Sequence, residues 1–461
     1  MNDTAYTHRF LARFVMEAET PLAVGSGVGD MNTDALVAKD VNGLPYIPGT
    51  SLSGIIRHAL GEEKTKNFFG YQIQGKSKES KGSDIIFTEA KMIGKEGKVI
   101  DGLTDINWSD DFYVHFVDLP IRQHARINGK GVTVDTGKFD EQVVYKGTRF
   151  CFELEMVADD KDESWSNFES VIQQLSSETF RVGSGTRTGF GKMKIVSCKC
   201  RNLDLLKPED LKFYENKSSD LSKDWDGNKE VKITKTSENW IVYHLSLIPE
   251  DFFLFGSGFG DDEADMTPVR EEYISWNDNG PHFENNAILI PAASLKGALA
   301  HRVAYHYNKL DNVFADEIDK DDYIKHIGKN NIAVKSLFGS EGERADGKMV
   351  DQKRGNVLFS DIIENKNTID KIVNHVSIDR FTGGAIDGAL FTEKTIYGKN
   401  QKFDTYIYVN KTAFHDEKIK AAFENALKDL CTGLLPLGGG VNRGNGTFTG
   451  NFTIAEEGER L

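Results

Sequence analysis

The chain has 461 residues, of which 39% are hydrophobic and 28% are charged. At about 100–200 residues per domain, this length predicts two or three domains with ordinary buried cores, and the composition excludes wholesale disorder. The formal net charge of −15 argues against a protein that coats nucleic acid non-specifically, since phosphate binding normally shows as a basic excess, although Lys and Arg can still cluster on one face.

The first residues lack the basic and apolar regions of a signal peptide, and no apolar run approaches the roughly 18 residues of a membrane span. The four cysteines are scattered, and Cys198-x-Cys200 has the wrong spacing for a zinc knuckle. We therefore expect a cytoplasmic protein that makes no membrane contact and has neither structural zinc nor disulfides.

In chain order, the first recognisable feature is a glycine-rich loop that recurs in the second half. Gly25-Ser26-Gly27-Val28-Gly29 leads to Asp34, and Gly256-Ser257-Gly258-Phe259-Gly260 leads to Asp265. The two stretches align without a gap, and apolar residues precede each. The pattern predicts a strand followed by a glycine loop in both halves.

A second pair of segments follows the loops, at 46–58 and 289–301. Pro48 and Pro291 are each followed three residues later by a serine and then by apolar residues at helical spacing. This pattern predicts the start of a capped helix in each half.

Three further pairs occur in the same order, at 67–70 and 336–339, 124–128 and 375–379, and 183–191 and 438–446. Five matching segments in one order indicate an internal duplication. We predict a first domain at 1–200, a largely polar linker at 201–235 and a second domain at 236–461.

The remaining patterns indicate the fold of each copy. Arg149–Val157 alternates apolar and polar residues as a half-buried strand does, and Thr405–Val409 is its counterpart. Ser166–Leu175 and Asp416–Leu430 have helical spacing. The order of elements predicts two tandem α+β domains with mainly antiparallel sheets, close to a ferredoxin-like arrangement.

The repeated pattern resembles the RAMP superfamily, in particular the backbone subunits of type III CRISPR effector complexes. The resemblance is carried by the loop ending in Asp34, by Gly43–Gly54, by the C-terminal glycine loops and, in the second copy, by Ile378–Gly388 with Glu393. It implies RRM-like domains with β-hairpin thumbs that stack along a guide RNA. A chain with two copies resembles the fused subunits of the type III-D group.

The resemblance also implies an activity. Family members that cut carry an aspartate in the loop after the first strand and cleave guide-paired target RNA beside each thumb with Mg²⁺ or another divalent cation. That aspartate maps onto Asp34, and the internal alignment adds Asp265, so these two would be catalytic and hold the metal. The expected partners are guide (CRISPR) RNA, target RNA and other subunits of the complex.

The residue chemistry agrees with this role without requiring it. A loop aspartate can hold Mg²⁺ through an oxygen or act as a base, and it can equally well be an ordinary loop cap. Asp30, Asp261 and Asp262 are nearby alternatives.

Candidate RNA-binding residues lie in the same segments. Glycines let backbone amides approach phosphates, helix N-termini favour anions, Arg and Lys pair with phosphate oxygens, and histidine can stack on a base or contact a 2′-hydroxyl. The candidates are Gly25, Ser26, Gly27, Ser51, Ser53, Arg57, His124, Arg126, Arg187, Gly256, Ser257, Gly258, Ser294, Lys296, His375, Arg380 and Arg443. Tight turns, helix caps and structural histidines are the alternative interpretations.

Three other features have two interpretations each. Phe139 and Phe391 are candidates for wedge residues at a hairpin tip, or for core residues. The basic segment Gln74–Lys81 is an RNA contact or a solvated loop.

Two other functions share most of these features. A scaffold subunit would bind guide RNA and its neighbours without cutting. A guide-precursor processing endonuclease of the same superfamily would use other acid–base groups, for which His58 and His301 stand at matched positions on the predicted helices. The substrate distinguishes the two nucleases, since one cuts a repeat-derived precursor and the other cuts guide-paired target.

Overall fold

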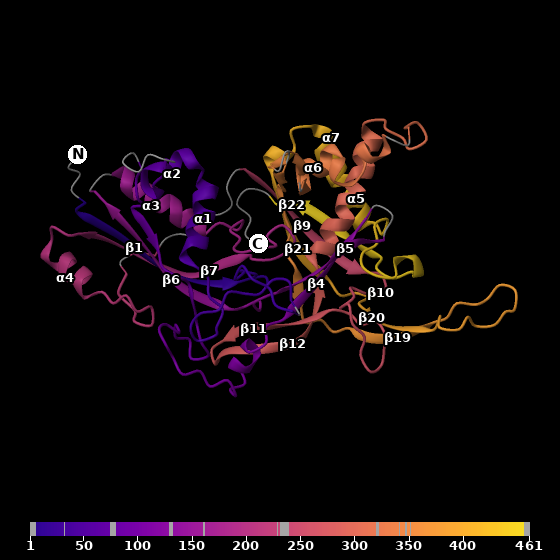
Figure 1. Cartoon of the computed structure of the whole chain (residues 1–461), viewed down its shortest axis with the longest axis horizontal. Coiled ribbons are helices and arrows are strands. Elements are labelled where there is room, and N and C mark those ends of the chain that lie inside the picture. The colour runs from indigo at the N-terminus through magenta and orange to yellow at the C-terminus, as the bar shows by residue number, and fades with distance from the viewer. Residues whose placement is uncertain are drawn as a thin grey trace.

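The computed structural model describes residues 6–31, 33–73, 80–128, 132–159, 162–227, 229–230, 239–319, 322–340, 342–345, 348–350 and 352–455. The two copies lie next to each other along the long axis of the molecule (Figure 1). Most of the basic segment at 74–81 lies outside the described residues. None of the described helices is both long and apolar enough to cross a bilayer.

The first copy is built on an antiparallel sheet with the strand order β2-β6-β1-β7. These strands are β1 (His8–Ala18), β2 (Ile85–Phe87), β6 (Arg149–Ala158) and β7 (Met193–Asp204), with β3 (Lys91–Met92) and β8 (Lys229–Glu230) paired alongside. The helices are α1 (Gly49–Leu60), α2 (Glu62–Phe69) and α3 (Asp162–Leu175).

The second copy repeats this sheet as β17-β21-β9-β22. Its strands are β9 (Trp240–Pro249), β17 (Val357–Leu358), β21 (Phe403–Asn410) and β22 (Phe448–Ile454), and its helices are α5 (Ala292–Leu310), α6 (Ile332–Phe338) and α7 (Glu417–Cys431). With helices after the first and third core strands, this order is that of a ferredoxin-like fold. The predicted duplication and fold class are therefore confirmed.

Each sheet buries aromatic and aliphatic side chains beneath its helices. In the first copy, Phe14 and Phe152 stack with centroids 5.0 Å apart, and Leu52 of α1 and Phe168 of α3 are fully buried over the sheet. The predicted helix starts are also confirmed, because α1 begins directly after Pro48 and α5 directly after Pro291, but the expected capping was wrong, since the N-cap residue is the proline itself and makes no side-chain hydrogen bond. Proline suits this position because it lacks the N–H that a helix start leaves unpaired.

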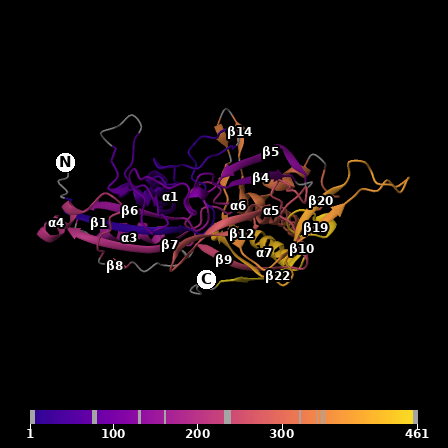
Figure 2. The same ribbon diagram turned by 90° about the horizontal axis from the view of Figure 1, so that it is seen from below.

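A β-hairpin projects from each copy. We call these hairpins thumb 1, formed by β4 (Ile121–Ile127) and β5 (Thr133–Gln142), and thumb 2, formed by β19 (Ile369–His375) and β20 (Phe391–Tyr397). Thumb 1 lies along the second copy, whereas the tip of thumb 2 extends away from the body (Figures 1 and 2). His124 and His375 lie on the first strand of thumb 1 and of thumb 2, respectively.

A further hairpin, formed by β11 (Arg270–Asn277) and β12 (Gly280–Ile290), reaches from the second copy into the first. The backbone N–H of Ile274 donates to the carbonyl of Lys146 at 2.8 Å, and the indole N–H of Trp276 donates to that of Gly147 at 2.7 Å. Ile274 belongs to the core of the first copy. The sequence reading missed this hairpin.

The expected linker is largely a structured part of the first copy. Residues 201–204 end β7, and helix α4 (Pro208–Asn216) follows. Trp225 then packs with Leu11 and Leu203 on the sheet face opposite α1 and α3, and the guanidinium of Arg13 donates to the carbonyl of Lys223 at 2.7 Å. Of the predicted linker, only 228 and 231–235 lie outside the described residues.

The remaining short elements complete the second copy. They are β10 (Phe252–Phe253), β13 (Gly339–Ser340), β14 (Glu343–Ala345), β15 (Lys348–Val350), β16 (Lys353–Arg354) and β18 (Ile362–Glu364). β13 pairs with β16 next to the end of α6, and this pair forms part of the basic cavity described below.

Candidate nucleic-acid interface and aspartate loops

The glycine loop of the first copy connects to its own thumb through Asp34. The backbone N–H of Asp34 donates to Oδ1 of Asp140 on β5 at 2.8 Å. In return, the backbone N–H of Asp140 donates to Oδ2 of Asp34 at 3.1 Å. The Asp34 side chain is exposed, so its carboxylate is oriented by the thumb and accessible from solvent.

The second copy repeats this link with a different partner. The N–H of Asp265 donates to the hydroxyl of Thr392 at 2.9 Å, and the N–H of Thr392 donates to Oδ2 of Asp265 at 2.8 Å. The hydroxyl of Thr392 also donates to Oδ2, at 2.9 Å. These backbone and side-chain hydrogen bonds lower the pKa of Asp265, which favours the charged form. Asp34 and Asp265 therefore occupy structurally equivalent points.

The neighbouring aspartates act as loop caps. Oδ1 of Asp30 accepts the N–H of Thr33 at 2.7 Å, and Oδ1 of Asp261 accepts the N–H of Ala264 at 2.8 Å. Asp261 also pairs with Lys394 of β20 at 2.6 Å, and this pair with the backbone hydrogen bonds lowers the pKa of Asp261 to about 2. Asp30 and Asp261 thus shape the loops at matched positions, whereas Asp34 and Asp265 are the matched pair that contacts the thumb backbone.

A histidine, a phenylalanine and a glutamate recur on the paired strands of each thumb, where His124 lies opposite Phe139 and His375 opposite Phe391. His124 stacks on Phe139 with ring centroids 4.7 Å apart, and its Nε2 lies 3.1 Å from Oε1 of Glu141. In thumb 2 the same arrangement joins His375 to Phe391 at 4.8 Å and to Glu393 at 3.1 Å. Both histidines are therefore held by protein partners.

The two glutamates anchor the C-terminal glycine loops. Glu141 accepts from the hydroxyl of Ser184 at 3.1 Å. Glu393, which is 1% exposed, accepts from Arg443 at 2.6 Å and from the side-chain amide of Asn445 at 3.0 Å. Burial opposes ionisation of Glu393, but Arg443, Asn445 and the imidazole together hold its pKa below the usual range. The sequence analysis named Glu393 as part of the family resemblance but missed Glu141, although the repeated Phe-x-Glu pattern is a signal for both.

Arg187 and Arg443, predicted as equivalent phosphate contacts, lie in different environments. Arg443 pairs with Glu393 inside its own copy, whereas the guanidinium N–H of Arg187 crosses to the second copy and donates to the carbonyl of Gly355 at 2.7 Å. Burial, with smaller contributions from Arg354 and Arg181, lowers the pKa of Arg187 to about 9. In the aligned loops Asn442, not Arg443, stands opposite Arg187.

The loop serines are used within the loops. The hydroxyl of Ser26 donates to the carbonyl of Leu36 at 3.2 Å, and that of Ser257 donates to the carbonyl of Phe259 at 3.0 Å. The adjacent Gly27 and Gly258 have φ of 84° and 89°, a backbone conformation that disfavours any side chain. Gly25 and Gly256 pair with the return segment of each loop.

The remaining predicted RNA contacts lie either on the helices α1 and α5 or near the tip of thumb 2. Ser51, Ser53 and Arg57 lie on α1, and Ser294 and Lys296 lie at the matching positions of α5. Arg380 is exposed beyond β19, near the tip of thumb 2.

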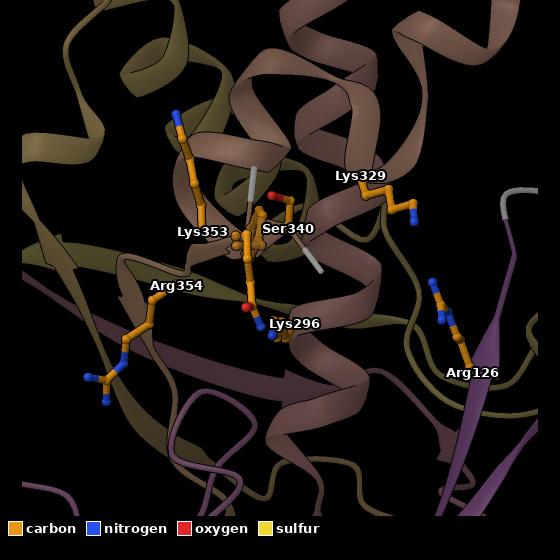
Figure 3. A pocket seen from close by; sticks show the side chains of 9 residues that line it. Arg126, Lys296, Lys329, Ser340, Lys353 and Arg354 are labelled. Carbon is orange, nitrogen blue, oxygen red and sulfur yellow. The ribbon is translucent and has the colours of Figure 1, made fainter. Parts of the chain in front are cut away.

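Arg126 and Lys296 meet at a basic cavity of about 650 Å³ between the copies. Arg126 enters from β4 of thumb 1, and the other side chains come from the second copy (Figure 3). The lining consists of Arg126, Lys296, Lys329, Phe338, Gly339, Ser340, Gln352, Lys353 and Arg354. It contains five cationic side chains and no carboxylate, in a chain with a formal charge of −15. Such a surface attracts phosphate groups.

Burial lowers the pKa of Lys296, and the nearby charge of Arg187 lowers it further. An anion in the cavity would offset both effects, since an opposite charge favours the ammonium form. Lys329, Lys353 and Arg354 were missed by the sequence reading because they have no repeated counterpart.

The residues at the aspartate loops fit a divalent cation only in combination with RNA. Among the described residues, no group of three or more His, Cys, Asp or Glu side chains is placed to hold a metal ion. Mg²⁺ commonly uses one or two carboxylates, several waters and substrate phosphate oxygens. Asp34 and Asp265 each provide one such exposed carboxylate, which makes a partial ligand set in each copy.

The comparisons with known proteins agree with the fold. A comparison with curated proteins gave no match. The family model for the RAMP superfamily matches residues 15–194 and 279–449, which together make up more than half of the chain and correspond to its two copies. The chain belongs to the RAMP superfamily, with two copies of the RAMP domain in tandem.

Proposed function

We propose that this chain is a backbone subunit of a type III CRISPR effector that binds guide RNA and cleaves complementary target RNA at two sites, one in each copy. The observation that carries the proposal is the pair Asp34 and Asp265. Each is an exposed carboxylate in the loop after the first strand, hydrogen-bonded to the thumb of its own copy. A repeated, oriented and accessible carboxylate is what a repeated cleavage site needs.

Cleavage by the RNA's own 2′-hydroxyl requires an in-line geometry and stabilisation of negative charge on the phosphate. The thumb would impose the geometry by displacing the target backbone next to the loop. Asp34 and Asp265 would hold a divalent cation, which would supply positive charge when bound. In the second copy, the lowered pKa of Asp265 keeps the carboxylate in the charged form that a cation needs.

Guide binding is supported by the basic cavity. RNA backbones carry one negative charge per nucleotide, and the five cations around the cavity come from both copies. Because Arg126 belongs to thumb 1 and Lys296 to α5, a phosphate in the cavity would connect the copies along one strand. Sequence-specific recognition would come from base pairing with the guide.

The proposal is tested with the assembled complex, guide RNA, labelled target RNA and Mg²⁺. Asp34→Ala is expected to remove one cut, Asp265→Ala a second, and the double variant both, while assembly and target binding persist. Asp262→Ala, in the same exposed loop as Asp265, is the matched control and is expected to leave every cut in place.

Two results would contradict the proposal. If all cuts persist in the double variant, the chain is a guide-binding scaffold. If the chain alone cuts repeat-derived precursor RNA and His58→Ala or His301→Ala stops it, the chain is a processing endonuclease.

A further inference from the structure

The contacts that orient Asp34 and Asp265 come from one strand of each thumb. Asp140 lies on β5, 106 positions after Asp34, and Thr392 lies on β20, 127 positions after Asp265. In both copies a parallel bridge continues the contact, joining Ala35 to Glu141 and Met266 to Glu393. Each aspartate loop is thus joined to its thumb along adjacent backbone positions.

The hydrogen bonds between the aspartate loops and the thumbs contribute little to the stability of the fold. Asp34 and Asp265 are exposed, and Asp140 and Thr392 are only half-buried. A reciprocal pair of hydrogen bonds between a surface loop and a hairpin fixes orientation more than it adds stability, since one intramolecular hydrogen bond contributes only about 1 kcal/mol net.

The chemistry of the link differs between the copies. In the first copy the thumb supplies a carboxylate, Asp140, and in the second it supplies a hydroxyl, Thr392. Two positions further along the strand, Gln142 accepts the N–H of Val37 at 3.2 Å, whereas Lys394 makes ion pairs with Asp261 at 2.6 Å and Glu263 at 2.8 Å. The same geometry is therefore held by different groups.

We propose that Asp140 and Thr392 are positioning residues. Each attaches the aspartate loop of its own copy to the thumb, which keeps the carboxylate at a fixed position relative to the target backbone that the thumb distorts. This proposal rests on the proposed function, because it concerns the same two sites. It assigns a role to two residues that the sequence reading did not single out, and it makes the two cuts independently adjustable.

The role follows from the groups involved. The side chain of Asp140 contributes one acceptor, Oδ1, to the backbone N–H of Asp34. The reciprocal hydrogen bond is donated by the backbone N–H of Asp140, which almost any residue at this position would supply. An uncharged acceptor therefore suffices, as Thr392 shows in the second copy. A misplacement of about 1 Å at a reacting group costs up to about 100-fold in rate.

The test compares single-turnover rates of each cut in the assembled complex. Asp140→Ala is expected to slow the first-copy cut by about 10- to 100-fold, while Asp140→Asn keeps the acceptor and stays within about threefold of wild type. Thr392→Val removes the hydroxyl and is expected to slow only the second-copy cut. Thr392→Ser keeps the hydroxyl, and its second-copy cut should proceed at close to the wild-type rate. Guide and target affinities should not change, since neither residue lines the basic cavity.

Amide hydrogen exchange supplies a readout that does not depend on cleavage. In the chain without RNA, Asp140→Ala is expected to speed exchange at the N–H of Asp34, and Asp140→Asn to leave it near wild type. The thermal midpoint should be similar in both variants.

Each possible result decides one of the two proposals. If Asp140→Asn is as slow as Asp140→Ala, the charge is needed and the positioning role is wrong. If Asp140→Ala slows both cuts equally, or leaves exchange at Asp34 unchanged, the link is not local and the role is also wrong. If Asp34→Ala itself leaves all cuts in place, the proposed function fails, and the exchange result alone then decides whether Asp140 holds the loop.

Discussion

Arg122 of the first copy and Asp361 of the second form a buried ion pair, with Nη1 3.1 Å from Oδ2 and side chains that are 6% and 0% exposed. Asp361 also accepts the backbone N–H of Ala292 at 2.7 Å, at the start of α5. Arg122 pairs in addition with Glu271 of β11. The base of thumb 1 is thus attached to the helix that carries Lys296, which fixes two sides of the basic cavity.

Removing either partner should destabilise the junction between the copies. Arg122→Met leaves the carboxylates of Asp361 and Glu271 buried without the cation that they share, and breaking a buried pair in this way costs about 3–5 kcal/mol. We expect a lower urea midpoint for Arg122→Met, measured by circular dichroism. Glu63→Gln, which breaks an exposed pair with Lys66 on α2, is the control and should leave the midpoint nearly unchanged. Equal effects of the two variants would contradict the assignment.

Gly147 tests the contact of the β11–β12 hairpin with the first copy. It has φ of 87°, and a Cβ there would lie 1.9 Å from the carbonyl oxygen of Ile274. Gly147→Ala should therefore displace the hairpin and lower the thermal midpoint. Gly97 has a similar φ of 71° but open space around the Cβ position, so Gly97→Ala carries only the backbone strain, about 1–2 kcal/mol.

Scanning calorimetry distinguishes these two effects. Gly147→Ala should lower the midpoint well beyond Gly97→Ala and broaden or split the transition, because the copies lose part of their shared core. If the two alanine variants melt alike, the contact with Ile274 does not hold the copies together.

Much of the fold could be predicted because local patterns are duplicated. Pro48 and Pro291 mark helix starts through the backbone chemistry of proline alone. The strand at Arg149–Ala158 follows from its alternating side chains. Such features depend on neighbours in the sequence, and the second copy provides an independent check of each.

The rest depends on contacts between distant residues. Nothing local in Ile274 or Trp276 indicates that the hairpin packs into the other copy. The polar composition of 201–235 suggests a linker, yet Trp225 is enough to attach it to the sheet. Likewise, Arg187 and Arg443 stand in similar loops, but a shift of one position directs them to different partners.

Glu393 should make the second copy sensitive to acid. Arg443, Asn445 and His375 hold its pKa below the ordinary 4.5 despite burial, so its ionised form stabilises the folded state above that pH. This stabilisation is lost as the pH falls through the lowered pKa. Glu393→Gln should therefore have a lower urea midpoint than wild type at pH 7, and the difference should shrink on acidification below pH 4.5.

A matched variant separates the charge of Glu393 from its packing. Arg443→Met removes the main ionic partner and should reproduce the loss at pH 7 together with the smaller pH dependence. A constant difference between wild type and Glu393→Gln over the whole acid range would contradict the role of the charge.

Lys296 should make RNA binding sensitive to alkaline pH. Burial and the neighbouring Arg187 lower its pKa from the ordinary 10.5, so the ammonium that attracts phosphate is lost at a lower pH than for an exposed lysine. Affinity for guide RNA should therefore fall as the pH rises through this lowered pKa. Lys296→Arg should keep its charge to a higher pH, because the ordinary pKa of arginine, 12.5, lies above that of lysine, and should move the loss of affinity to higher pH. Fluorescence anisotropy of labelled guide RNA, at fixed ionic strength, measures the affinity at each pH.

Removing the charge provides the complementary test. Lys296→Met should weaken binding at pH 7 and reduce the slope of log affinity against log salt by about 1, as expected for one lost phosphate contact. Lys399→Met, at an exposed position that is not part of the cavity lining, should change neither quantity. If Lys296→Arg and wild type lose affinity in parallel as the pH rises, another group governs the titration and the cavity does not hold the RNA phosphate.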